Sequence, residues 1–506
     1  MIEIDVNIVE IVTKGLFINS LDIFREYIQN SCDAIDDAVE AGIFQEGDGK
    51  IEITIGRAAR RITIEDNGMG IPTRYFERTM SRIGNSDKTL ETDRGFRGIG
   101  RLCGLAYCKE MRFSSTAKGE TKLSVMIIDA ERLRREFFRN NNRSAESVLR
   151  DVITFGKNDA EVNDHFFRVE LIDIVDTNKD LLDVEKVRDY LSFVAPVTYS
   201  PQFHFQTQIY KHAAALNFKL AEYKILVNGE PVVKNYKTSF NTFRNGADKI
   251  FDVYFRDFFD AEGNLIAWSW IGLSTFKAVI SELRETTDYK MRCIRLRTGN
   301  IQIGNAETLK HLFIEPRGIK YFIGEVHVVD TNLIPNSRRD YFEENDACNA
   351  LEIALREYFV ELHNIYHYAL EIKGAFHARN RLKKFEQKVE NHPTEYREKH
   401  NEEHSKKLAE LKENANKKEY IIYMGRLKVR DNPEALTSRI FKQITQNNES
   451  TPSDTLGKSN PSRTRLPLPR WSDERKKLYN EIYEIILANP KLAGDKLIEK
   501  FEESLK

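Results

Sequence analysis

Residues 24–34, FREYIQNSCDA, are the stretch of the chain that decides the fold. Glu26 and Asn30 lie four residues apart in it, so on a helix they share one face. A carboxylate and an amide one helical turn apart can align a water molecule and hold a metal ion. An isolated pair of this kind is most often part of an exposed helix face. The interpretation of the pair therefore depends on the motifs that lie further along the chain.

A short polar element, DNGMG, occupies residues 66–70. It comes directly after a predicted hairpin of two strands, 51–55 and 61–65, in which apolar residues alternate with polar ones. Asp66 can therefore lie at the floor of a pocket, where Gly68 and Gly70 let an adenine ring approach the backbone. A carboxylate accepts a hydrogen bond from the exocyclic amine of adenine, whereas guanine presents the wrong edge. The structural alternative is a simple turn after a strand.

A glycine-rich element, GFRGIG, occupies residues 95–100. Gly95, Gly98 and Gly100 leave backbone N–H groups free to bind phosphate where a helix, predicted over 101–108, begins. A flexible loop has the same composition, so this element alone is a weak signal. The order and spacing of the three elements together favour a nucleotide site.

In this order, the three elements resemble the gyrase B, heat-shock chaperone, histidine kinase and mismatch-repair (GHKL) ATPase superfamily. The helix, with its Arg-Glu pair and its Asn-x-x-Asp-Ala ending, is most similar to that of the ninety-kilodalton heat-shock chaperone (Hsp90-like) branch. The resemblance covers about the first 345 residues and implies an α/β (α+β) fold. It implies a GHKL ATP-binding helix-on-sheet sandwich over 1–200, then a middle, transducer-like α/β domain over 201–345.

The resemblance also implies roles for individual residues. Glu26 would be the general base and Asn30 the ligand of Mg²⁺, with ATP and Mg²⁺ as the cofactors. The residues implied to bind the nucleotide are Asn30, Asp33, Asp66, Gly68, Gly70, Lys88, Gly95, Gly98 and Gly100. Residues 84–94 would form a short lid, with Lys88 placed as in the mismatch-repair ATPases.

One position departs from the superfamily pattern. A Gly-Thr pair commonly precedes a late strand, with the threonine hydroxyl near the adenine, whereas the matching strand here reads FFRVEL at residues 166–171. Phe167 offers no hydroxyl group. Adenine recognition would then depend on Asp66.

The predicted middle domain carries a candidate catalytic arginine in the stretch LIPNSRRD, residues 333–340. This loop resembles one in the chaperone's middle domain, where an arginine reaches the γ-phosphate. Matching Arg-Asp to the chaperone's Arg-Glu selects Arg339, with Arg338 as the second choice, because a planar guanidinium suits the charge of the transition state. A surface Arg-Arg paired with nearby acids is the structural alternative. Lys277 and Lys320 are reserve candidates by analogy with the gyrase and mismatch-repair branches.

The composition excludes several classes of protein. The chain has 506 residues, of which 41% are hydrophobic and 31% charged, and its formal net charge is −1. Bulk charge therefore favours no partner. No apolar run reaches the roughly eighteen residues of a membrane span, and the N-terminus lacks the pattern of a secretory signal, so we expect a cytoplasmic protein. The five cysteines are odd in number and scattered, and we expect them to be reduced packing residues.

The rest of the chain is predicted to be helical. Apolar residues recur at helical spacing beyond residue 346, and charge dominates further on, so we expect a long helical arm over 346–430. A flexible linker is predicted over 431–470 and C-terminal helices over 471–506. At the other end, residues 1–12 alternate as a strand with one buried face.

The predicted function is an ATP-binding and ATP-hydrolysing conformational switch of the Hsp90-like type. It would close as a homodimer through the N-terminal strand and act on a protein partner that the sequence does not identify. One alternative is a DNA-associated ATPase clamp of the mismatch-repair or Microrchidia kind, for which the basic residues at 379–384 are a possible nucleic-acid surface. The other is a nucleotide-sensing scaffold with little hydrolysis.

Overall fold

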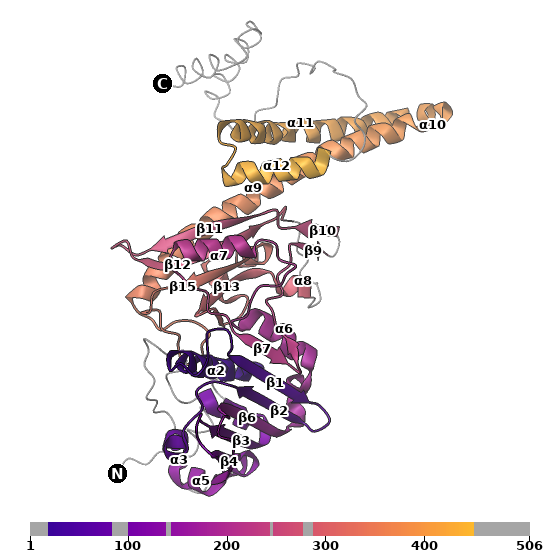
Figure 1. Ribbon diagram of the computed structural model, residues 1–506. Helices are drawn as coiled ribbons and strands as arrows, with labels where there is room; N and C mark the ends of the chain where they lie inside the picture. Colours follow the sequence, from indigo (N-terminus) through magenta and orange to yellow (C-terminus); the bar gives the residue numbers. More distant parts are fainter. Residues whose placement is uncertain (1–18, 83–99, 138–142, 243–245, 277–286, 450–506) are drawn as a thin grey trace. The chain divides into compact units, whose positions relative to one another are not determined.

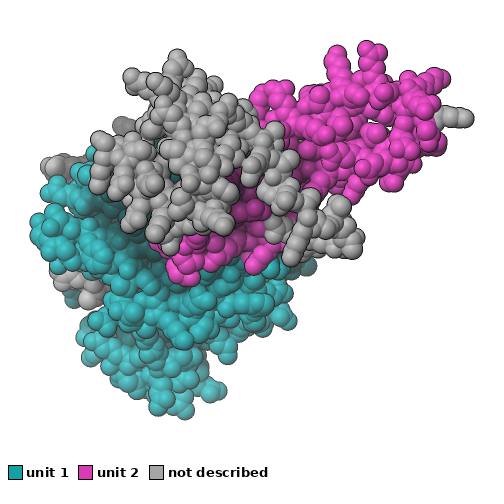
Figure 2. Space-filling view, turned by 90° about the horizontal axis from the view of Figure 1, so that it is seen from above, with its two compact units in different colours: residues 1–366 teal, residues 367–506 magenta. Residues whose placement is uncertain are grey.

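The computed structural model describes residues 19–82, 100–137, 143–242, 246–276 and 287–449 (Figure 1). The fold is mixed α/β, with two main sheets and a helical C-terminal region. The chain forms two compact units, residues 1–366 and 367–506, which have different colours in Figure 2. No helix among the described residues is long and apolar enough to cross a membrane.

The first unit contains an eight-stranded sheet in the order β5-β4-β3-β6-β2-β1-β7-β8. Neighbouring strands are antiparallel, except that β1 and β7 are parallel. The strands are β1 Lys50–Gly56, β2 Arg61–Asp66, β3 Cys108–Thr116, β4 Lys122–Asp129, β5 Ile153–Asp159, β6 Phe166–Ile174, β7 Lys224–Val227 and β8 Glu230–Pro231. The predicted hairpin is confirmed, because β1 pairs with β2 in register from Ile51↔Asp66 to Gly56↔Arg61.

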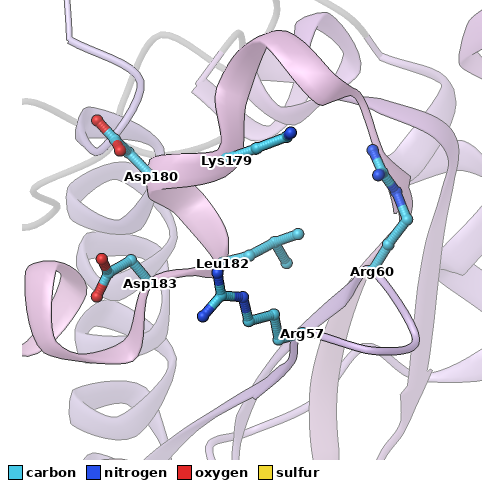
Figure 3. Close-up of a pocket in the computed structure, with 6 residues that line it drawn as sticks. All are labelled: Arg57, Arg60, Lys179, Asp180, Leu182 and Asp183. Carbon is cyan, nitrogen blue, oxygen red and sulfur yellow. The ribbon is translucent and has the colours of Figure 1, made fainter.

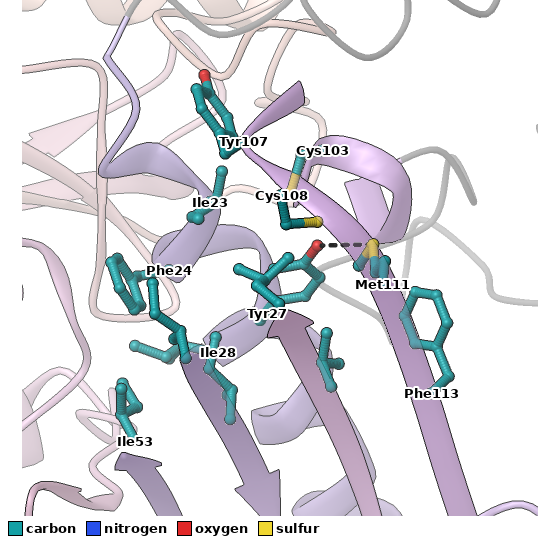
Figure 4. Packing of buried hydrophobic residues seen from close by; sticks show 14 of the residues in the cluster. Ile23, Phe24, Tyr27, Ile28, Ile53, Cys103, Tyr107, Cys108, Met111 and Phe113 are labelled. Carbon is teal, nitrogen blue, oxygen red and sulfur yellow. Dashed lines mark hydrogen bonds between the residues drawn. The ribbon is translucent and has the colours of Figure 1, made fainter. Parts of the chain in front are cut away.

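Helix α2, Asp22–Glu40, packs its apolar residues onto this sheet. Phe24, Tyr27 and Ile28 are buried, and the Tyr27 hydroxyl lies 4.0 Å from the sulfur of Met111 on β3 (Figure 4). This packing fixes the rotation of α2 and therefore the direction of its polar residues. The other helical segments of this part are α3 Thr73–Ser81, η2 Gly100–Ala106, α4 Ala130–Phe137, α5 Ala145–Val152, η3 Asp176–Leu182 and α6 Val184–Val194.

The helix predicted over 101–108 is present, but it is a 3₁₀ helix and ends two residues earlier than predicted. Residues Gly100–Ala106 form a 3₁₀ helix, and Cys108 already begins β3. Gly104 explains the difference, because glycine disfavours an α-helix and here it permits a close approach. A Cβ atom at Gly104 would lie 2.4 Å from Leu171 and 2.6 Å from the Tyr27 hydroxyl.

A second sheet has five strands in the order β11-β12-β15-β13-β14. These strands are β11 Asp252–Phe259, β12 Leu265–Leu273, β13 Cys293–Thr298, β14 Ile301–Ile303 and β15 Ile323–Val328. Strand β15 follows a 3₁₀ helix that Pro316 opens and that runs to Tyr321. The remaining elements are α7 Gln206–Ala215, β9 Ser239–Thr242, β10 Gly246–Lys249, α8 Thr287–Lys290, η4 Thr308–Leu312 and η5 Pro316–Tyr321.

Strands β7 and β8 belong to the first sheet, although they lie beyond the predicted domain boundary at residue 200. Ile225 pairs with Ile51, and Val227 with Ile53. Strands β7 and β8 form a hairpin, with Asn228 and Gly229 at positive φ in its turn. The range predicted as the middle domain, 201–345, therefore contributes two strands to the first sheet.

A buried network of charged and polar groups centres on Glu325 of β15, whose side chain is fully buried. Its carboxylate accepts hydrogen bonds from Tyr199 at 2.6 Å and from Lys234 at 3.2 Å, and it is paired with Arg297 of β13. Tyr236, Trp270 and His327 also contact it. Arg297 donates in addition to the Phe193 carbonyl of α6 at 2.7 Å. The network therefore connects α6 to the second sheet.

Helices form the described part of the chain after residue 345: α9 Asp346–Glu390, α10 Thr394–Lys399, α11 Asn401–Asp431 and α12 Leu436–Glu449. Helices α9 to α11 lie in and just beyond the range 346–430 that is predicted to be a helical arm. Helix α12 lies inside the range predicted to be a linker, where Phe441 packs against Gly425 of α11 so closely that a Cβ atom there would be 2.1 Å from the ring. The C-terminal helices predicted over 471–506 and the strand predicted over 1–12 lie outside the described residues.

The five cysteines are buried and form no disulfide, as expected from their number and spacing.

Candidate nucleotide site

Helix α2 carries the first part of the candidate site. Glu26 and Asp33 are buried, and Asn30 is partly buried, one turn from Glu26. The buried Gln29 Oε1 makes no hydrogen bond in the part of the chain that the structure describes; Glu26 Oε1 makes none either, but arginine guanidinium groups approach it as ion-pair partners. Buried polar oxygens without a hydrogen-bond donor are costly unless a ligand or water supplies one.

Asp66 lies at the end of β2 with its carboxylate buried against α2. Its Oδ2 accepts a hydrogen bond from Ser31 Oγ at 2.7 Å, and its Oδ1 accepts one from the Gly68 N–H at 3.0 Å. Burial raises the pKa of Asp66 to about 7, although the two hydrogen bonds act in the opposite direction. The group can therefore change its charge near neutral pH.

Ser31 supplies the hydroxyl group that Phe167 lacks. Asp66 pairs with Phe167 in the register of β2 and β6, so a threonine there would lie beside the aspartate. In this chain α2 supplies a hydroxyl to Asp66 instead of β6. Ser31 follows Asn30 directly in the stretch 24–34. Its contact with Asp66 could not be predicted, because the local sequence pattern does not show how close Ser31 lies to the sheet.

Glycines make the close approaches in the site. A Cβ at Gly68 would lie 2.6 Å from the backbone of Ala34, and one at Gly70, where φ is +67°, would lie 2.0 Å from the Thr116 carbonyl oxygen. A Cβ at Gly100 would lie 2.6 Å from Glu26 Oε2. The structure therefore brings the end of the predicted phosphate loop against the predicted base.

His165 is a residue that sequence reasoning missed. Its Nδ1 lies 3.0 Å from the Gly68 carbonyl oxygen, and its ring stacks on Phe44 at 5.9 Å. The contact holds the DNGMG turn from the loop before β6. No sequence pattern marks this role, since a single histidine before a strand is usually a surface residue.

Arg339 lies at the predicted base. Its Nε is 3.2 Å from Glu26 Oε1, and both side chains are largely buried, 12% and 7% exposed. Arg25 also approaches this oxygen, at 3.7 Å. Arg338, the second choice, is exposed. The structure thus brings together two residues that are far apart in the sequence and that were predicted separately.

A tight turn positions Arg339. Its φ is +53°, a left-handed conformation that costs energy for a non-glycine residue. Its carbonyl accepts from the Gly304 N–H at 2.8 Å, and its own N–H donates to the Asn336 carbonyl at 3.0 Å. The Asn336 amide in turn donates to Asp340 at 2.7 Å. The turn is therefore anchored on the end of β14.

Lys88, Gly95, Gly98 and Lys277 lie outside the described residues. Lys320 is paired with Glu307 at 2.8 Å.

A separate hollow of about 420 Å³ lies beside the turn between β1 and β2 (Figure 3). Arg57, Arg60 and Lys179 line it together with Asp180 and Asp183. Arg60 is already bound to Asp173 and Asp176. None of the predicted nucleotide-site residues that the structure describes lines this hollow, and its charges largely balance.

Residues 20–152 match the family model of the histidine kinase-, DNA gyrase B- and HSP90-like ATPases. The match supports the GHKL superfamily for the domain that carries Glu26, Asp66 and Gly100, and this type of domain implies the binding of ATP. No curated protein matches the chain.

The residues present fit ATP and Mg²⁺. A buried carboxylate at Asp66 suits the amine of adenine. The amide oxygen of Asn30 is a hard neutral donor of the kind that Mg²⁺ accepts.

The charge of Asp66 gives a first prediction. We expect affinity for adenosine to rise with pH through about 7, by up to about tenfold per unit below the pKa, because only the ionised carboxylate accepts fully from the adenine amine. Calorimetric titration between about pH 5.5 and about pH 8.5 measures this. Adenosine is preferred to ATP because it carries no phosphate that titrates in this range.

The matched variant is Asp66→Asn, which keeps the shape of the side chain but cannot ionise. It should bind adenosine weakly at every pH. An affinity in Asp66→Asn equal to that of the native chain would contradict the adenine assignment.

Proposed function

We propose that this chain is a slow Mg²⁺-dependent ATPase that works as a conformational switch of the Hsp90-like type. The observation that carries the proposal is the contact of 3.2 Å between Glu26 and Arg339. Glu26 and Arg339 are predicted from two separate motifs. An Arg-Arg pair that served only as solvent-exposed surface would not be expected to contact a buried carboxylate of α2. The proposed division is a nucleotide domain over 1–200, a middle domain over 201–345, and a helical extension after it.

The proposed chemistry assigns one task to each side chain. Asp66 accepts the adenine amine and selects the base. Glu26 orients the attacking water and takes its proton, as a general base must do at hydrogen-bond distance. Arg339 stabilises the negative charge that develops on the transferred phosphoryl group. Mg²⁺, held by Asn30, would neutralise charge on the phosphates when it is bound.

The pairing of Glu26 with Arg339 also gives a reason for a switch. An arginine bound to the base holds its carboxylate away from water. The γ-phosphate competes with Glu26 for the guanidinium and so releases Glu26; because one anionic partner replaces another, this exchange adds little to ATP affinity. ATP binding and rearrangement of the proposed middle domain then favour each other by the same coupling free energy. Closure through the strand predicted over 1–12, as a homodimer acting on a protein partner, is part of this proposal.

Arg339→Ala tests the proposal. We expect turnover to fall by a factor of order 10² or more, with ATP affinity nearly unchanged, because the arginine acts mainly on the transition state. Steady-state ATPase rates and calorimetry measure the two quantities. Arg338→Ala is the matched control, because it removes the adjacent guanidinium, which is exposed. If Arg338→Ala gives the defect and Arg339→Ala does not, the assignment is off by one residue.

A further inference from the structure

Arg101 follows the last glycine of the predicted phosphate loop, and no role was predicted for it. Its carbonyl accepts a hydrogen bond from the Tyr27 hydroxyl at 3.1 Å, and Tyr27 is the neighbour of Glu26 on α2. Gly100, which precedes it, packs against the Glu26 carboxylate. The backbone of Arg101 is therefore fixed at the phosphate end of the proposed site.

The guanidinium of Arg101 has no acidic partner among the described residues. It donates to two carbonyl oxygens, that of Thr79 at 3.0 Å and that of Arg82. Its Nε is buried and has no hydrogen-bond partner within the described part of the chain. Burial lowers the pKa of Arg101 to about 10, with no compensating anion there. The two other arginines near Glu26 differ, since Arg25 and Arg339 both approach its carboxylate.

A structural role at the end of α3 explains only part of this arrangement. Carbonyls at the C-terminal end of a helix attract a cation. That attraction is weak beside the cost of removing a guanidinium from water, which a buried cation normally recovers from a paired anion. The described part of the site supplies no such anion to Arg101. The triphosphate of ATP is an anion of the right kind, and a guanidinium binds phosphate oxygens well.

We propose that Arg101 binds the phosphate chain of ATP, as a second cation beside Arg339. This inference rests on the proposed function. It assigns Arg101 to phosphate binding in the ground state, whereas Arg339 acts mainly on the transition state. The contribution of Arg101 therefore grows with the number of phosphates on the ligand and is absent for adenosine.

Arg101→Gln tests this role by calorimetry with adenosine, ADP and ATP in the presence of Mg²⁺. We expect ATP affinity to fall on the order of tenfold or more, ADP affinity to fall less, and adenosine affinity to stay unchanged. The nucleotide-free variant should unfold at the same denaturant concentration as the native chain, or at a higher one, because a partly buried charge without an acidic partner among the described residues has been removed. Arg101→Lys, which keeps the charge, should recover part of the ATP affinity.

Arg78→Gln is the matched control, because it removes an exposed guanidinium from the last turn of α3. It should change none of these quantities. An equal loss for all three ligands in Arg101→Gln, together with lower stability of the nucleotide-free protein, would show that Arg101 only caps α3. Unchanged ATP affinity would also overturn the inference. If the native chain binds adenosine but Arg101→Gln binds ATP normally, only this inference fails. If the native chain binds none of the ligands, the proposed function fails with it.

Discussion

Glu26→Gln is expected to bind ATP with nearly the affinity of the native chain and to hydrolyse it more slowly by a factor of order 10² to 10⁴, the range for loss of a general base. The amide keeps the shape of the carboxylate but cannot take a proton from water. Binding depends on groups elsewhere in the site, above all Asp66. Calorimetry and steady-state ATPase rates measure the two effects separately.

Glu40→Gln is the matched control, since Glu40 is an exposed glutamate on the same helix. Equal rates in Glu26→Gln and the native chain would remove Glu26 from the chemistry.

Because hydrolysis is blocked, Glu26→Ala also shows whether ATP drives assembly. Sedimentation with a non-hydrolysable ATP analogue should shift it to a compact dimer, and deletion of residues 1–10 should weaken the shift. A mass that never responds to nucleotide would contradict the switch.

The local parts of the site could be predicted well from the sequence, because they depend on short-range patterns. The positions of Glu26 and Asn30 on α2 follow from helical periodicity, and Asp66 follows from the end of a strand with alternating isoleucines. The choice of Arg339 over Arg338 came from a family resemblance. The structure supports this choice geometrically, because Arg339 contacts Glu26 whereas Arg338 is exposed.

Features that depend on contacts between distant segments were predicted poorly. Strand β7 pairs with β1, and nothing in the local pattern at 224–227 distinguishes that partner from a strand of the predicted middle domain. Gly104, inside the 3₁₀ helix that begins at Gly100, packs closely against Leu171, which is distant in the sequence. Helix α12 forms within a polar stretch because α11 offers it a surface.

The network around Glu325 also could not be predicted from the sequence. Glu325 alternates with apolar residues in β15, in the stretch Ile323 to Val328, but every residue of that strand is buried. A strand buried on both faces gives no periodic signal for which polar residue is paired. Its partners come from four separate segments, at Tyr199, Lys234, Trp270 and Arg297.

The charge state of the network follows from the same contacts. Burial alone would raise the pKa of Glu325, but Arg297 and Lys234 hold it well below its usual range. The carboxylate is therefore ionised, and it is the counter-charge of the buried Arg297 guanidinium, whereas burial and the nearby Arg297 charge lower the pKa of Lys234 to about 7. Removal of the carboxylate leaves Arg297 buried without a counter-charge.

Glu325→Ala is accordingly expected to lower the free energy of unfolding by about 3–5 kcal/mol, the range for a buried ion pair that loses one partner. Chemical denaturation of the nucleotide-free protein measures this. Tyr236→Phe is the control, because it removes one donor to the same carboxylate, at 3.1 Å, and should cost only about 1 kcal/mol. A loss in Glu325→Ala no larger than that of Tyr236→Phe would mean that the cations find other partners or water. Since Arg297 also binds the Phe193 carbonyl of α6, the loss should loosen the attachment of the second sheet and reduce ATPase turnover along with stability.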